Sequence, residues 1–175
     1  LQTGPTNAVE AAEIWVKDGA SFMVSGSTSK RLYNKFHLSG EGHNGFGAIY
    51  TDTDKSVSFY DAEWHLDSDV TVGIKESKNE MSLYSMDIYM NRHSMRINMD
   101  KSDSNLQFDR VSIYAAGNIT VVKGGFQPQG YSYWYSMEKA YVTLTNGANF
   151  AFYNSISYYG ENVSLRFAPG GTYKW

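Results

Sequence analysis

The residues best suited to chemistry in this chain are two carboxylates, Glu63 and Asp87, which hold equivalent places in two similar segments. Each alternates with apolar residues, so both are expected on the outer face of a strand. If the two segments stack as neighbouring strands, the carboxylates lie about 5 Å apart, close to the separation found in retaining glycosidases. A polar outer face gives the same pairing without catalysis. We therefore assign no catalytic residue and predict that the chain is not an enzyme.

Other catalytic and metal-binding patterns are absent from the sequence. It contains no Gly-x-Ser-x-Gly, His-Glu-x-x-His or phosphate-loop motif. Cysteine is absent, which excludes disulfides, thiolate metal sites and cysteine nucleophiles. The histidines show no paired spacing within one strand, although stacking would bring His65 near Tyr89, His93 or Tyr114. We expect no metal site and no cofactor.

A segment rich in tyrosine and tryptophan is the stronger candidate for binding. The repeat described below leaves extra residues between two of its copies, so an inserted loop is expected at 124–139. Loops on a rigid scaffold commonly carry binding, and these rings suit sugars or a protein partner. The candidate ligand-binding residues are Tyr131, Tyr133, Trp134 and Tyr135. Alternatively, the aromatic residues fold back and cap the side of the domain. In either case Trp134→Ala should leave stability nearly intact.

The elements that position these residues are predicted from a repeat. Five segments read apolar-x-apolar, a short break, then small-or-apolar-x-apolar, which is the alternation of strands with one buried face. They lie at 14–24, 57–66, 81–90, 106–115 and 142–152. A second alternating strand follows at 70–74, 95–99, 119–121 and 163–167. The three central copies start at Val57, Met81 and Leu106, so the repeat length is nearly constant there.

A repeat of this length made almost wholly of strand indicates a right-handed parallel β-helix. The spacing predicts roughly seven coils in a single domain spanning 1–175, with Phe59, Leu83 and Phe108 stacked on one another. The alternative is a β-sandwich or jelly roll, which would place short hairpin turns between successive strands. The 14 Tyr, 9 Phe, 4 Trp and 16 Gly, beside only 3 Pro, fit an all-β chain.

Parts of the sequence resemble the autotransporter-associated β-strand repeat. The resemblance rests on residues 36–49, which read FHLSGEGHNGFGAI, and on residues 66–74, which read LDSDVTVGI. The corner at 146–148, Asn-Gly-Ala, is similar to one common in pectin-lyase-like surface adhesins. The resemblance implies an autotransporter passenger displayed outside the cell on a bacterial surface. It also implies that such a segment serves as an adhesin.

Three hypotheses about function follow. The first is a surface adhesion and display module that binds a host glycan or surface protein through the loop aromatics. The second is a carbohydrate-active β-helix, such as a polysaccharide lyase, a hydrolase or a phage tailspike fragment. The third is a purely structural stalk. The net charge of −3 gives no electrostatic basis for binding nucleic acid. No apolar run reaches membrane-spanning length, so membrane insertion is not expected. The sequence leaves open whether the rods self-associate.

Overall fold

The computed structural model describes residues 12–74, 80–99, 104–145, 148–151, 153–159, 162–167, 169 and 172–174. Within these residues the chain forms strands and one 3₁₀ turn, η1 (His43–Gly45). The strands are β1 (Glu13–Val16), β2 (Phe22–Ser25), β3 (Lys30–Leu32), β4 (Lys35–Gly40), β5 (Ile49–Asp52), β6 (Val57–Tyr60), β7 (Glu63–Ile74), β8 (Glu80–Tyr89), β9 (Met95–Met99), β10 (Asn105–Tyr114), β11 (Ile119–Val122), β12 (Gly124–Trp134), β13 (Ala140–Leu144), β14 (Ala148–Ala151), β15 (Tyr153–Tyr159), β16 (Val163–Phe167) and β17 (Thr172–Lys174).

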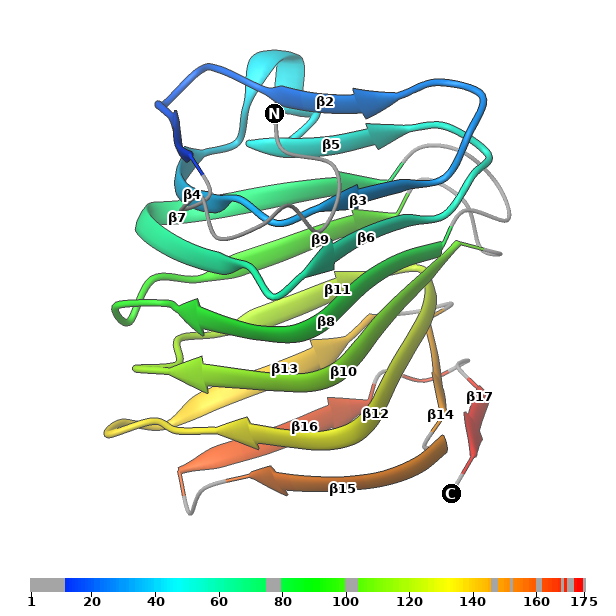
Figure 1. Cartoon of the computed structure of the whole chain (residues 1–175). Coiled ribbons are helices and arrows are strands. Elements are labelled where there is room, and N and C mark those ends of the chain that lie inside the picture. Colours follow the sequence, from blue (N-terminus) through cyan, green and yellow to red (C-terminus); the bar gives the residue numbers. More distant parts are fainter. Residues whose placement is uncertain are drawn as a thin grey trace.

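These strands wind into a three-sided parallel β-solenoid, as the repeat predicts (Figure 1). Face 1 consists of β1, β4, the start of β7, the ends of β8, β10 and β12, and β15. Face 2 consists of β2, β5, the end of β7, β9, β11, β13 and β16. Face 3 consists of β3, β6, the starts of β8, β10 and β12, β14 and β17. The described pairings are all parallel, which rules out the hairpins of a sandwich.

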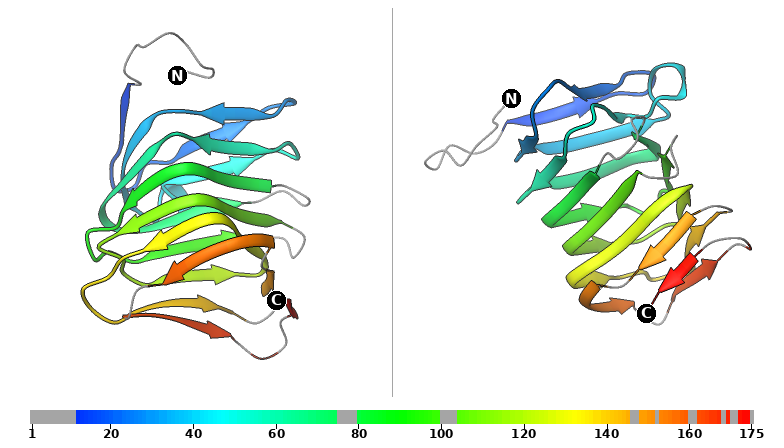
Figure 2. Two further views of the ribbon diagram at one scale, coloured as in Figure 1. Left: turned by 60° about the horizontal axis from the view of Figure 1, so that its bottom comes forward. Right: turned by 90° about the vertical axis from the view of Figure 1, so that its right-hand side faces the viewer.

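The chain advances from one end of the rod to the other (Figures 1 and 2). In each face, the first and the last strand have a described neighbour on one side only. The solenoid therefore has about five turns with a coil both above and below. This is slightly fewer than the roughly seven coils that we expected.

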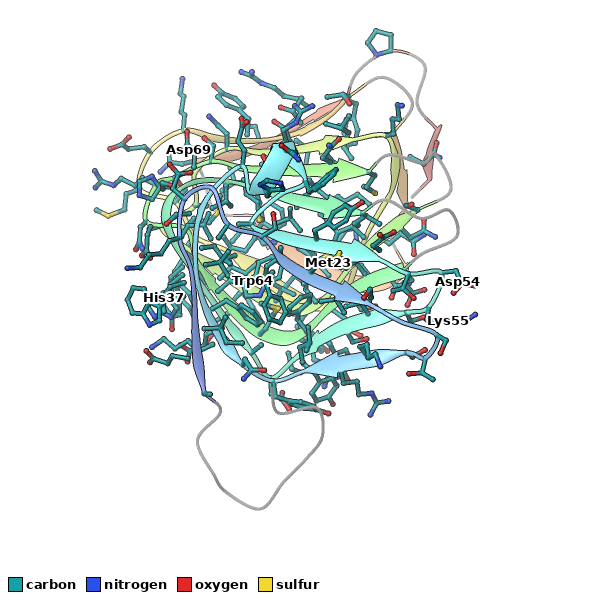
Figure 3. All side chains as sticks on the ribbon, turned by 90° about the horizontal axis from the view of Figure 1, so that it is seen from above. Met23, His37, Asp54, Lys55, Trp64 and Asp69 are labelled. Atoms are coloured by element: carbon teal, nitrogen blue, oxygen red, sulfur yellow. The ribbon has the colours of Figure 1, made fainter. Side chains whose placement is uncertain are left out.

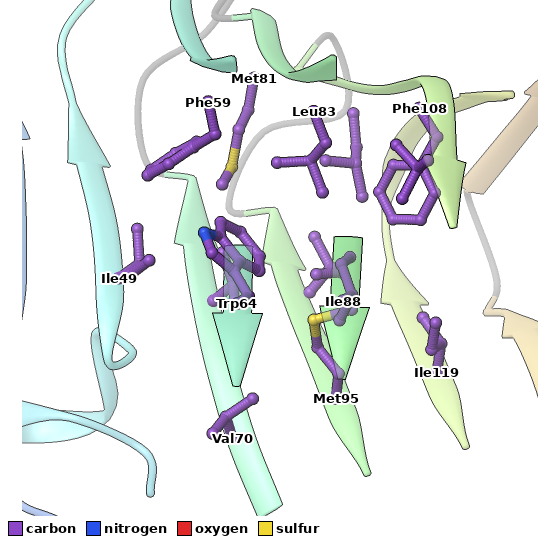
Figure 4. Packing of buried hydrophobic residues seen from close by; sticks show 14 of the residues in the cluster. Ile49, Phe59, Trp64, Val70, Met81, Leu83, Ile88, Met95, Phe108 and Ile119 are labelled. Carbon is purple, nitrogen blue, oxygen red and sulfur yellow. The ribbon is translucent and has the colours of Figure 1, made fainter. Parts of the chain in front are cut away.

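Apolar side chains from successive coils stack in columns inside the rod (Figure 4). The predicted stack is confirmed, since Phe59 pairs with Leu83 and Leu83 pairs with Phe108, all fully buried. Viewed along the axis, Trp64 lies inside the ring of strands and His37 lies outside it (Figure 3). Among the described residues, the buried apolar cluster extends from Val16 to Ala148, and this burial stabilises a fold that lacks disulfides.

The expected inserted loop at 124–139 is wrong. Residues 124–134 form strand β12, which crosses from face 3 to face 1 and is paired with β10 on one side and with β14 and β15 on the other. Phe126 and Trp134 of this strand are 0% and 1% exposed and pack around Phe108. The segment is therefore part of the paired coils, with a shift of register between Asp109 and Ser112. The repeat is shorter here than between the central copies, because Leu106 pairs with Phe126.

The alignment of the repeat copies also needs correction at both ends. The three central copies run from face 3 to face 1, in the predicted register. The copy at 14–24 instead runs from face 1 to face 2, and the start of the copy at 142–152 lies on face 2. All three faces alternate with period two, so alternation alone does not identify the face to which a strand belongs.

The corner between faces 3 and 1 is made by residues with positive φ. Asp61, Ser85 and Arg110 have φ of 47°, 49° and 56°, and Gly130 takes the same place on the next coil with φ of 61°. A Cβ at Gly130 would meet the end of the Asp109 side chain, and glycine takes the positive φ of this corner with less strain than the residues that hold it on the preceding coils. A column of left-handed residues thus turns the chain at the same point on each of these coils.

Burial decides which substitutions should unfold the rod. Ile88→Asp or Ile113→Asp places an unpaired charge in a fully buried column and should unfold the domain. Because Trp134 is 1% exposed, Trp134→Ala should cost about 3–5 kcal/mol, contrary to the expectation from sequence. Tyr131→Ala, at a site 57% exposed on the same strand, should stay within about 0.5 kcal/mol of the parent. Denaturant melts measure the ranking, and a larger loss for Tyr131→Ala than for Trp134→Ala would contradict this packing.

Candidate binding face

The outer side of face 1 carries a ladder of stacked rings, one from each of six successive coils. It runs Trp15, His37, His65, Tyr89, Tyr114 and Tyr135. Successive ring centroids lie 3.6, 5.1, 4.5, 5.0 and 5.6 Å apart, and no pair of planes is inclined by more than 24°. Strand pairing places these residues in register, because Trp15 pairs with His37 and His65 pairs with Tyr89. The predicted approach of His65 to Tyr89 is confirmed.

This aromatic ladder limits what the inner members can bind. A ring stacked on both sides has its two faces covered, so it offers solvent only its edge and its polar group. Sugars and apolar groups commonly bind to the open face of a ring. The inner members of the ladder therefore hold the coils together, and ligand contacts through ring faces require rings outside the stacked run.

A column of charged side chains runs beside the aromatic ladder. Strand pairing aligns Glu13 with Lys35, Lys35 with Glu63, and Glu63 with Asp87. Lys35 Nζ lies 3.3 Å from Glu13 and 3.8 Å from Glu63. A Glu63 carboxylate oxygen lies 2.9 Å from His65 Nε2. The predicted placement of Glu63 and Asp87 on adjacent coils is thus confirmed, and Glu63 is already engaged by two neighbours.

Asp87 lies in a less favourable environment than its neighbours in the column. Partial burial raises the pKa of its carboxyl above the ordinary value of 3.8, and the negative charge of Glu63 raises this pKa further. A hydrogen bond with Ser112 partly opposes these effects on the pKa. Such a carboxyl is the kind that general acid catalysis uses, but structural columns of like charge produce the same effect.

The other two histidines, His43 and His93, lie outside the aromatic ladder. His93 lies beyond the corner that follows β8, with its Nδ1 3.8 Å from an Asp69 carboxylate oxygen. In the part of the chain that the structure describes, no three His, Asp or Glu side chains are grouped so as to hold a metal ion.

The four predicted binding residues separate into two sets because strand β12 alternates. Tyr131, Tyr133 and Tyr135 point outward and are 57%, 39% and 45% exposed. Trp134 points inward, where it pairs with Ile113 in the core column, so it cannot contact a ligand from solvent. The prediction of Trp134 as a binding residue is therefore wrong, whereas the three tyrosines remain candidates.

Tyr114 completes this group, which we call the tyrosine patch: Tyr114, Tyr131, Tyr133 and Tyr135. Tyr114 is 36% exposed and stacks on both Tyr89 and Tyr135, so it contributes its ring edge and hydroxyl to the patch. Tyr133 lies 6.3 Å from Tyr135. Met137, 81% exposed, follows at the next corner, where Arg92 and Glu138 form an exposed ion pair at 3.3 Å. The patch therefore combines exposed aromatic surface with a charged border.

Sequence reasoning missed Tyr114 and Met137 as members of this surface. The signal for Tyr114 was present, because Tyr89, Tyr114 and Tyr135 follow one another at close to the spacing of the repeat. It was hidden by the assumption that residues 124–139 lay outside the coils. Nothing in the sequence marked Met137, whose exposure depends on the course of the corner.

Comparisons with family models, with curated proteins and with solved structures find no match to this chain. Its candidate site must therefore be interpreted from its own geometry. Among the described residues, no helix has the length and apolar character needed to cross a membrane.

Because the pKa of Asp87 is raised, replacing its carboxyl with a neutral amide should stabilise the fold in a pH-dependent way. A carboxyl with a raised folded-state pKa stabilises the fold below its unfolded pKa, and this contribution is lost as pH rises through the folded pKa. Asp87→Asn should therefore raise the melting temperature at pH 7, and this advantage should vanish at or below the ordinary pKa of 3.8. Thermal melts of both proteins from pH 3 to pH 7 measure the difference, and Asp54→Asn, at an exposed turn, is the control. An advantage that is constant with pH would exclude this origin.

Proposed function

We propose that this chain is a non-enzymatic adhesion and display module of a bacterial surface, in which the tyrosine patch binds a host protein. The β-solenoid fold suits a rigid display element, because each coil rests on the next. The passenger-like sequence motifs support the extracellular location. The binding role rests on one observation, the exposure of four tyrosines on the neighbouring coils of β10 and β12 in face 1.

The composition of the patch favours a protein partner. Tyrosine, methionine and arginine are enriched in protein interfaces, with aromatic residues at the centre and charges at the rim. The tyrosine patch has this arrangement, with Met137 and the Arg92–Glu138 ion pair beside it. Several adjacent exposed aromatic residues mark an interaction site more often than single exposed ones do.

The scaffold beneath the patch is already ordered. The end of β12 pairs with β10 on one side and with β15 on the other, and Trp134 anchors it in the core. A tyrosine has only two side-chain torsions, and here Tyr114, Tyr133 and Tyr135 are further restrained by contact with one another. Little conformational entropy is therefore lost on binding, which favours affinity.

The adhesion proposal is tested by cell-surface display. Bacteria that display the chain should adhere to a panel of immobilised extracellular-matrix proteins. Adhesion should fall about tenfold or more when Tyr131, Tyr133 and Tyr135 are all changed to Ser, since these positions supply the centre of the interface. A matched control changes Tyr33, which directly follows β3, and Tyr141, on the outer side of face 2, to Ser. No adhesion by the parent, or equal adhesion by the patch variant, would overturn the proposal, provided that both proteins melt at the same temperature.

Glycoside hydrolysis is a second candidate function, favoured by the in-register pairing of Glu63 with Asp87 and by the raised pKa of Asp87. In this mechanism Asp87 would protonate the leaving oxygen while Glu63 acts as the nucleophile. The engagement of Glu63 by His65 and Lys35 opposes this role.

Product analysis on a panel of polysaccharides tests this second function. If it holds, Glu63→Gln or Asp87→Asn should lower the rate of release of reducing ends by roughly 100-fold or more. Equal rates in the parent and the two variants would remove it.

A further inference from the structure

We propose that face 3 carries a second binding site, which takes a neutral saccharide in a groove across β6, β8 and β10. This site lies on a different face from the tyrosine patch and goes beyond the adhesion function proposed above. It involves none of the candidate residues identified from the sequence.

The groove has a volume of about 230 Å³. It is lined by Arg31, Ser58, Tyr60, Ser82, Tyr84, Gln107 and Asp109. Its strands follow one another down the rod in Figure 1. Its size suits a single sugar ring of a longer chain.

The groove arises from a change of side-chain size along one column. Strand pairing aligns Arg31 with Ser58, Ser58 with Ser82, and Ser82 with Gln107. The two serines are short and their neighbours above and below are long, so the serines form a floor between two raised ends. Tyr60 pairs with Tyr84 and Tyr84 with Asp109, and these three residues form a second, parallel column beside the floor.

The residues around the floor are held in place by one another. The rings of Tyr60 and Tyr84 stack with centroids 4.4 Å apart, and the Arg110 guanidinium lies 4.1 Å from the centre of the Tyr84 ring. Ser82 Oγ donates a hydrogen bond to Glu80 Oε1 at 3.1 Å. Gln107 Nε2 donates to Gln127 Oε1 at 3.3 Å. The groove is thus preorganised and needs little rearrangement to receive a ligand.

Asp109 supplies the strongest acceptor at one end of the groove. Burial raises the pKa of its carboxyl, so this group has given up part of its hydration in the folded protein. Arg110 Nε lies 3.4 Å from one carboxylate oxygen, Oδ1. A carboxylate held in this way forms strong, charge-assisted hydrogen bonds with neighbouring hydroxyl donors of a ligand.

The chemistry of the lining selects the class of ligand. The groove offers hydroxyls from two serines and two tyrosines, a carboxamide, one carboxylate and one guanidinium. This set both donates and accepts hydrogen bonds, which matches the hydroxyls of a sugar. Its formal charges, from Arg31 and Asp109, cancel, so neither an anion nor a cation is favoured. Because the tyrosine faces are covered, no broad apolar wall is available for a hydrophobic ligand.

Filling the floor of the groove tests the proposal. The probe is an array of neutral and anionic oligosaccharides, and any bound oligosaccharide is then titrated by calorimetry. The parent should bind neutral members, and Ser82→Gln should abolish binding by occupying the floor. Glutamine is tolerated in this column, since Gln107 and Gln127 already lie there. Asp109→Asn keeps the shape of the groove but removes the charge, and should weaken binding about tenfold or more.

Controls separate this site from the tyrosine patch. Thr143→Gln makes a similar enlargement on the outer side of face 2 and should leave saccharide binding unchanged. The triple tyrosine-to-serine variant of the patch should also bind saccharide normally, so failure of the adhesion proposal would not affect this one. An array on which the parent binds nothing, or binds only anionic members, would overturn the proposal. Unchanged binding by both Ser82→Gln and Asp109→Asn, each with the melting temperature of the parent, would also overturn it.

Discussion

The structure depends on the parallel hydrogen bonding of each coil to the next in strict register. Neighbouring strands lie about 4.8 Å apart, so a residue pairs with the equivalent residue of the next coil and their side chains superpose. Inside the rod this produces apolar columns such as Phe59, Leu83 and Phe108. On the outer surface the same register brings each outward side chain into contact with the side chain at the equivalent position of the next coil.

In the aromatic ladder of face 1, the register decides which rings hold the coils together and which remain exposed to a partner. Stacking along the axis covers the faces of His65 and Tyr89 and converts those rings into contacts between coils. At the end of β12 and directly after it, Tyr131, Tyr133 and Tyr135 point outward at alternate positions, and the aromatic surface spreads sideways across the face. The same residue type therefore stabilises the rod in one place and presents a surface for a partner in another.

Electrostatics follow from the same superposition. A column that brings Glu63 beside Asp87 sets like charges one strand spacing apart, which adds to the effect of burial in raising the pKa of Asp87. Lys35 offsets the charge of Glu63, which also lies within hydrogen-bond distance of His65, and Arg110 offsets the charge of Asp109. The groove of face 3 arises from differences in side-chain size. Two short serines lie between longer side chains and leave a hollow on the surface of the sheet.

The sequence alone determined the all-β fold, the winding of the chain and the register of the central coils, because alternation and a nearly constant repeat length are local properties. It also placed Glu63 beside Asp87 and His65 beside Tyr89, since both follow directly from that register. Only the tertiary structure decided which face each terminal copy joins, because all three faces share one alternation. It also decided that Trp134 is buried while Tyr131 and Tyr133 are exposed. That difference depends on the register of β12. The repeat between β10 and β12 is shorter than the repeat between the central copies, because Leu106 pairs with Phe126.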